Sequence, residues 1–185
     1  MKSREYYLEL LHSHIGNPRL VAHSKASEAV MRALARRFGE SEELWGLTGL
    51  LHDIDSEICG GDSRIHAVKG SQILREEGFP EEAVRAVLLH NEMAAGEKRS
   101  TVFEHALAAG ETVTGLIFAV AMVYPDRKIS SVKVKSVVKR MKEKIFAASV
   151  KRENIMECEE IGIHLEEFVE MAIEALAPIE EELGF

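Results

Sequence analysis

Hydrophobic residues recur every three or four positions along most of this chain. A first set, at positions 6, 7, 10 and 11, falls on one helical face and ends before Gly16-Asn17-Pro18. A second set extends from about Arg19 to Phe38 with the same spacing. No segment alternates hydrophobic and polar residues as a half-buried strand does. The pattern therefore predicts an all-α fold.

Capping residues mark where the central helices begin and end. Gly39 follows the second pattern, where a C-cap glycine is expected. Ser41 is suited to N-cap a third helix, whose first turn holds two glutamates that favour the positive end of the helix dipole. This third helix is expected to end at His52 and Asp53.

Further helical patterns follow along the rest of the chain. Their approximate bounds are residues 64–77, 81–90, 101–124, 153–160 and 165–183. Thr101 and Glu104 have the spacing of a capping box. Ser130 or Ser131 is expected to cap an additional basic helix that extends to about Lys144.

Length and composition indicate one soluble globular domain. The chain has 185 residues, of which 46% are hydrophobic and 29% are charged. With only 4 prolines and 13 glycines, there is little room for a linker. The net charge of −8 argues against nonspecific binding of nucleic acid through a basic surface.

Several features favour a cytoplasmic protein that does not interact with a membrane. The N-terminal residues lack the apolar core of a signal peptide, and the longest apolar run, 116–124, is too short to span a bilayer. Cys59 and Cys158 are far apart, without metal-type spacing, and are expected to be reduced thiols.

The candidate chemistry is centred on a histidine-aspartate pair. His52 and Asp53 directly follow the apolar run 44–51. An imidazole nitrogen beside a carboxylate oxygen is suited to a divalent metal. Other residues of the same chemical types lie at intervals around this pair: His23, His66, His90 and Glu111. An antiparallel helical bundle can bring such positions into one pocket.

These residues resemble the HD superfamily of metal-dependent phosphohydrolases. The family pattern is a histidine, then a His-Asp pair, then a distant aspartate, all on helices. His23 matches the first ligand and His52-Asp53 the pair, whereas Glu111 stands where the family has aspartate. His66 and His90 match the extra histidines of members that hold two metals. The similarity extends to residues 146–153, which resemble a small prokaryotic group of predicted HD hydrolases.

The resemblance implies one HD-type bundle over residues 1–185, with a metal core at about 19–124 and a helical extension at about 130–185. A metal-activated water would attack phosphorus, with His52 and Asp53 central to catalysis. Asp53 would bridge two ions. The remaining ligands would divide into His23, His52 and Glu111 for one ion, and His66 and His90 for the other.

The ligand set favours one or two Mn²⁺, Fe²⁺, Co²⁺ or Ni²⁺ ions over Ca²⁺, and Mg²⁺ is an alternative for a looser site. The expected partner is a nucleotide or another small phosphorylated substrate. Arg64 and Lys69, near His66, are candidates for holding its phosphate, although solvated surface charges are the ordinary alternative. Asp55 or Glu57 is a candidate for orienting a ligand histidine.

The same residues are also compatible with two alternative functions. A histidine-rich site with two irons could activate dioxygen, as in an oxygenase-like enzyme on the HD scaffold. A non-catalytic sensor could hold metal or nucleotide for structure, and Glu111 in place of aspartate keeps this alternative open. The hydrolase is the favoured hypothesis.

Overall fold

The computed structural model describes all of residues 1–185, and it contains helices and no strand. The prediction of an all-α fold is therefore confirmed. The two longest helices are α2 (Pro18–Phe38) and α8 (Val102–Met122), and three helices of intermediate length are α1 (Arg4–His14), α3 (Glu42–Leu51) and α11 (Leu165–Leu176).

The other helices are shorter. They are α4 (Ser56–Cys59), α5 (Val68–Glu76), α6 (Glu81–Leu89), α7 (Glu92–Ala95), α9 (Val134–Met141) and α10 (Arg152–Glu160). Two 3₁₀ segments, Ile129–Ser131 and Ala177–Ile179, complete the chain. The short helices α4 and α7 were not predicted from the hydrophobic pattern.

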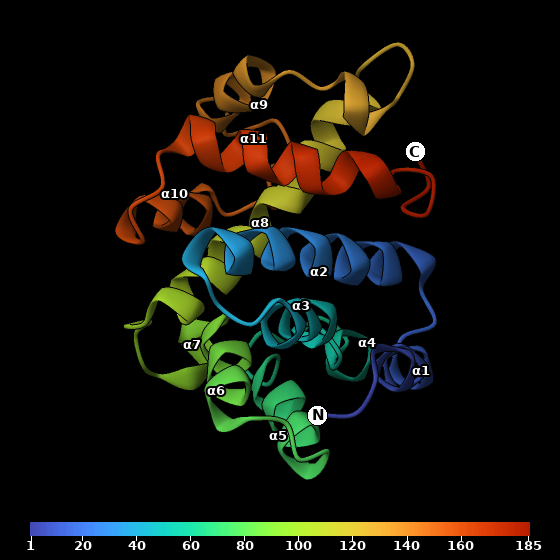
Figure 1. Ribbon diagram of the computed structural model, residues 1–185, viewed down its shortest axis with the longest axis vertical. Coiled ribbons are helices and arrows are strands. Elements are labelled where there is room, and N and C mark those ends of the chain that lie inside the picture. Colours follow the sequence, from blue (N-terminus) through green and yellow to red (C-terminus); the bar gives the residue numbers. More distant parts are fainter.

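Helix α2 lies across the middle of the molecule (Figure 1). It packs against α3 on one side, α11 on the other, and α8, which passes behind both α2 and α11 in this view. Helices α1, α3, α5 and α6 lie on one side of α2, and α9, α10 and α11 lie on the opposite side. Because α2 contacts three of its neighbours directly, it fixes their relative positions.

Helices α2 and α3 approach each other closely at Gly49. A Cβ atom at this position would lie only 2.6 Å from the backbone oxygen of Ser27 and 2.9 Å from the Cγ atom of Met31. The absence of a side chain therefore lets the two backbones pack against each other. Since α2 contains His23 and α3 ends at His52, this contact determines how far apart the two histidines lie.

The predicted caps of the central helices are confirmed. Gly39 has the left-handed conformation, with φ of 70°, that ends α2. The Ser41 hydroxyl accepts a hydrogen bond from the Leu44 backbone N–H at the start of α3. Thr101 and Glu104 form both hydrogen bonds of a capping box at the start of α8.

The helix expected from about residue 64 begins instead at Val68. The Asp62 carboxylate accepts the backbone N–H of Arg64, which favours a turn over a helix. Ala67 then adopts a positive φ of 73°, and its backbone N–H donates to the buried Asp55 carboxylate. Contacts with Asp55 and Asp62, which precede it in the chain, therefore bend the segment 64–67.

The boundaries of the C-terminal helices also differ from prediction. Neither Ser130 nor Ser131 caps the basic helix, because both lie in a 3₁₀ segment and their hydroxyls donate to Glu180 and Asp126, respectively. The basic helix α9 begins at Val134 without a side-chain cap. Helix α11 ends at Leu176 rather than near residue 183, since Pro178 has no N–H to continue the helical hydrogen bonds.

Helix α8 is the most apolar element. By length and composition alone, its 21 residues would suffice to cross a membrane, with a mean hydropathy of 1.4 over the relevant window. However, 67% of that window is buried, and α8 packs against α2 and α10. These contacts are those of a core helix. The expectation that the protein lacks a membrane partner stays a prediction.

The close contact between α2 and α3 leads to a stability prediction. Gly49→Ala should lower the free energy of unfolding by about 1–3 kcal/mol, because the added methyl group meets backbone that has no room to move. Gly46→Ala in the same helix is the control, since the three atoms nearest to its Cβ would all belong to the Arg32 side chain rather than to backbone. Chemical denaturation followed by circular dichroism measures both; equal losses would contradict the proposed backbone contact.

Candidate metal centre

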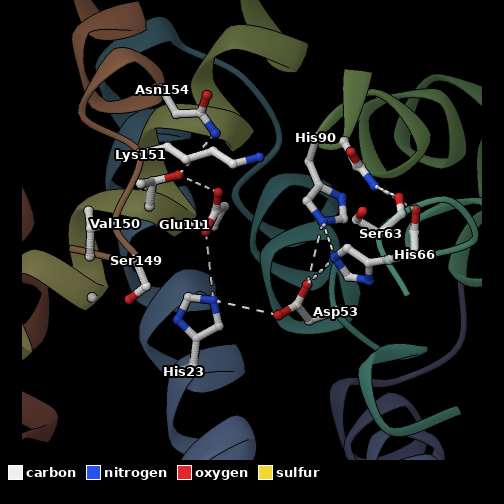
Figure 2. Close-up of a pocket in the computed structure, with 13 residues that line it drawn as sticks. His23, Asp53, Ser63, His66, His90, Glu111, Ser149, Val150, Lys151 and Asn154 are labelled. Carbon is white, nitrogen blue, oxygen red and sulfur yellow. Dashed lines mark hydrogen bonds and ion pairs between the residues drawn. The ribbon is translucent and has the colours of Figure 1, made fainter. Parts of the chain in front are cut away.

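One cavity lies where the ends of several helices meet, and five of the six predicted metal ligands line it (Figure 2). These five are His23, Asp53, His66, His90 and Glu111. The sixth, His52, is fully buried, and its Nε2 atom lies 3.2 Å from Nε2 of His23. The structure therefore brings together all six residues, which come from separate parts of the sequence.

The Asp53 carboxylate lies at the centre of this arrangement. Its Oδ1 atom is 3.5 Å from Nε2 of His52, 3.2 Å from Nε2 of His66 and 3.4 Å from Nε2 of His90. Its Oδ2 atom is 3.8 Å from Nε2 of His23. Both oxygens of one carboxylate thus face imidazole nitrogens, as a carboxylate shared between two ions requires.

The ligand atoms form two compact groups that share Asp53. One group is His23, His52 and Asp53, and the other is Asp53, His66 and His90. Within each group the ligand atoms lie within 4.8 Å of one another. Both groups have the imidazole and carboxylate composition that suits a divalent transition metal.

A third group, Asp55, Cys59 and His66, meets the same distance criterion. Burial and the neighbouring Asp55 carboxylate raise the pKa of the Cys59 thiol to about 11. Metals bind the thiolate, so a protonated Cys59 is a poor ligand. Asp55 is also fully buried and occupied by hydrogen bonds. We therefore assign this third group to support of His66.

Hydrogen bonds define the tautomers of His52 and His90. Nδ1 of His52 lies 2.7 Å from the Gly49 carbonyl oxygen, and Nδ1 of His90 lies 2.6 Å from the Val87 carbonyl oxygen. A carbonyl oxygen only accepts, so both Nδ1 atoms must carry the proton. The Nε2 atom of each neutral ring then presents a lone pair toward Asp53.

The orientation of His23 depends on a threonine in α8. Nδ1 of His23 lies 2.9 Å from the Thr114 hydroxyl oxygen. That hydroxyl donates its only proton to the Glu111 carbonyl oxygen at 2.6 Å, so it must accept from His23. Nε2 of His23 is therefore also free to act as a ligand.

His66 is oriented by a buried carboxylate. Its Nδ1 atom lies 2.8 Å from Oδ1 of Asp55, whose Oδ2 accepts the backbone N–H groups of Ala67 and Gly70. Such a carboxylate partner fixes the ring and makes the opposite nitrogen a better metal ligand. Glu57, the other acid considered for this role, instead accepts the backbone N–H groups of residues 16 and 17.

These contacts leave lone pairs facing each other at short range. Nε2 of His23 and Nε2 of His52 are 3.2 Å apart, and Nε2 of His66 and Nε2 of His90 are 3.0 Å apart. Two lone pairs at this distance repel unless a proton or a metal ion lies between them. The donor set therefore fits bound cations, which is the chemical requirement of a metal centre.

The pKa values reflect the same need for positive charge. Burial lowers the pKa of His52 to about 3, so this imidazole is neutral. Burial also opposes the charge of His66, but its hydrogen bonds to Asp53 and Asp55 outweigh this effect and raise its pKa to about 10. Burial would raise the pKa of Asp53, yet the surrounding histidines hold it well below its usual value.

Glu111 lies beside the group formed by His23, His52 and Asp53. Its Oε2 atom is 3.7 Å from Nε2 of His23, and its Oε1 atom accepts the Thr112 hydroxyl. The preceding Gly110 packs closely against Met31 in α2, which fixes the backbone from which Glu111 extends. Burial raises the pKa of the Glu111 carboxyl. Its role as a ligand stays a prediction.

The two residues considered for phosphate binding do not line the cavity. The Arg64 side chain is 85% exposed and forms an ion pair with Asp62 at 2.8 Å. Lys69 is half-buried and lies outside the set of lining residues. Closeness to His66 in sequence therefore does not bring either side chain into the cavity.

Other lining residues were not identified from the sequence. They are Ser63, Asn91, Thr112, Gly115, Ser149, Val150, Lys151 and Asn154. Residues 149–151 fall in the segment 146–153, whose family resemblance was the one available signal for them. Asn91 and Thr112 directly follow His90 and Glu111, but polar residues at such positions are too common to be distinctive.

Comparisons with known proteins agree with this geometry. A family model described as HD domain matches residues 20–122. The matched region contains all six predicted ligands, and it ends before the lining residues of the segment 149–154. Neither the comparison with curated proteins nor that with solved structures gives a match.

The support of His66 by Asp55 can be tested directly. Asp55→Asn should weaken binding of the ion held by His66 and His90 about 10- to 100-fold, because an amide nitrogen cannot accept the hydrogen bonds now made by the carboxylate. Asp62→Asn, in the nearby loop, is the matched control. Titration of chelator-treated protein with Mn²⁺ measures both variants, with circular dichroism to verify folding; equal affinities would remove Asp55 from this role.

Proposed function

Since this chain belongs to the HD-domain family of metal-dependent phosphohydrolases, we propose that it hydrolyses a phosphate ester of a small molecule. The observation that carries the proposal is the convergence of four Nε2 atoms, in two close pairs, on the two oxygens of one carboxylate. A site for a single structural ion needs neither a shared carboxylate nor a second pair of imidazoles.

The two groups of ligand atoms that share Asp53 suggest which residues would hold each metal ion. His23 and His52, with Glu111 nearby, would hold one ion, and His66 and His90 would hold the other. Asp53 would contribute negative charge to both. Imidazole and carboxylate ligands together favour Mn²⁺, Fe²⁺, Co²⁺ or Ni²⁺, and Mg²⁺ is the alternative for a looser site.

Bound divalent ions lower the pKa of a water ligand toward neutrality and neutralise phosphoryl oxygens. The protein's own contribution is orientation. Each Nδ1–H bond holds an imidazole ring with Nε2 directed toward Asp53, so no ring has to reorient when metal ions bind.

Hydrolysis is expected to depend on Asp53. Protein loaded with Mn²⁺ should release phosphate from at least one member of a panel of phosphomonoesters and nucleotides. Asp53→Asn should reduce this rate by more than roughly a hundredfold, because it removes the charge and the ligand shared by both groups. Asp62→Asn is the control for loss of an acidic side chain.

Phosphate release that is unchanged by Asp53→Asn would contradict the proposal. So would the absence of turnover across the panel with each of Mn²⁺, Fe²⁺, Co²⁺ and Ni²⁺. If iron-loaded protein then consumed oxygen, the oxygenase hypothesis would replace it, and inert metal-loaded protein would favour a sensor.

A further inference from the structure

One wall of the cavity comes from a segment beyond the region matched by the HD family model. Ser149, Val150 and Lys151 precede α10, and Asn154 lies in its first turn; all four line the cavity (Figure 2). The family match ends at residue 122. The part of the chain that completes the cavity is therefore distinct from the part that supplies the metal ligands.

This segment is held in place by an arginine that has no acidic partner. The Arg152 guanidinium donates to the carbonyl oxygens of Ala147 at 2.6 Å and Val150 at 2.7 Å, and also to that of Phe146. Val150 lies against Gly115 in α8, with its Cγ2 atom 3.4 Å from the place where a Cβ would stand, which is van der Waals contact. The chain before α10 is thus folded around Arg152 and against α8.

Lys151 is the only lysine or arginine that lines the cavity, and it forms no ion pair. Figure 2 shows its side chain extending along the rim past Glu111, with the ammonium group directed toward the side of His90. The nearest charged alternatives are already paired, since Arg99 contacts Glu157 and Arg64 contacts Asp62. Lys151 is therefore a cation available to an anion in the cavity.

Three other lining residues have polar atoms that make no hydrogen bond within the protein. The hydroxyls of Ser63 and Ser149 have no partner. Asn91 donates its amide hydrogens to the carbonyl oxygens of Ser63 and His66, which leaves its Oδ1 atom as a free acceptor. Free hydroxyls and an amide oxygen are suited to hydrogen bonding with hydroxyl groups of a ligand.

The cavity lacks the surface that a nucleobase needs. No phenylalanine, tyrosine or tryptophan lines it, and Val150 is its one hydrophobic residue. Bases are commonly held by stacking on aromatic side chains. The cavity volume of about 290 Å³ is also at the lower end for ligand pockets.

The cavity adjoins a second hollow, with which it shares His90, Asn91, Lys151 and Asn154. No aromatic residue other than His90 lines this hollow either. Its four glutamates, Glu92, Glu97, Glu153 and Glu157, outnumber its three cations, which are Lys98, Arg99 and the shared Lys151. A ligand that extended in this direction with further phosphates would meet repulsion.

We propose that the substrate is a phosphomonoester of a small, hydroxylated molecule, and that Lys151 contacts its phosphate oxygens. Ser63, Asn91 and Ser149 would hydrogen-bond to its hydroxyl groups. Arg152 is a positioning residue that holds Lys151 at the rim. This assignment rests on the proposed phosphohydrolase function, and it names the substrate class and the residues that select it.

The first test measures anion binding without turnover. Inorganic phosphate is titrated calorimetrically into Mn²⁺-loaded protein. Lys151→Gln should weaken its binding about tenfold, Lys151→Arg should retain most of the affinity, and Lys144→Gln should leave it unchanged, because Lys144 is exposed and does not line the cavity. Absence of phosphate binding by the parent, or equal affinity in Lys151→Gln, overturns the assignment of Lys151.

The second test concerns the substrate class. Glycerol phosphate and small sugar phosphates should displace phosphate from the parent, and be hydrolysed by it, at least about tenfold better than adenosine monophosphate. The opposite order overturns the substrate class while leaving the hydrolase function intact. Conversely, binding that follows the expected order in protein that turns over no ester would support the recognition site and reject the proposed hydrolysis.

Discussion

The site depends on one electrostatic constraint: the Nε2 atoms of four imidazoles converge on a single carboxylate. Backbone carbonyls fix the protons of His52 and His90 on Nδ1, so their Nε2 atoms cannot donate to each other or to Asp53 while the rings are neutral. Burial holds His52 neutral. Positive charge must therefore enter the cluster, as a proton on His66 or as a metal ion. A cluster with this requirement is already organised for cations before they bind.

The helical bundle maintains this arrangement through contacts between backbones. Gly49 allows α3 to lie directly against α2, and its carbonyl oxygen also accepts the Nδ1 proton of His52. One residue thus determines both the spacing and the orientation of a ligand. Thr114 has the corresponding role for His23, and Asp55 for His66. The orientation of each ligand is consequently part of the folded core rather than a property of a flexible loop.

The sequence allowed prediction of the all-α fold from its helical periodicity. It also allowed prediction of the residues that gather at the cavity, because the order of His23, His52-Asp53 and the further histidines resembles the HD family. It did not reveal which contacts orient them. The Thr114 hydroxyl and the His23 ring are 91 residues apart in sequence, and only tertiary packing brings them within 2.9 Å. Proximity in sequence was also misleading for Arg64, whose exposed side chain pairs with Asp62 outside the cavity, whereas Lys151 lines the cavity from a distant segment.

The central claim is that the two groups around Asp53 hold divalent metal ions. The most direct measurement is elemental analysis of protein purified without chelator, repeated after reconstitution with Mn²⁺ or Fe²⁺ and removal of unbound metal. The account predicts about one to two ions per chain as isolated, and no fewer after reconstitution. If both preparations lack stoichiometric metal although the chain is folded, the imidazole pairs are stabilised by protons alone, and the metal centre described above does not exist.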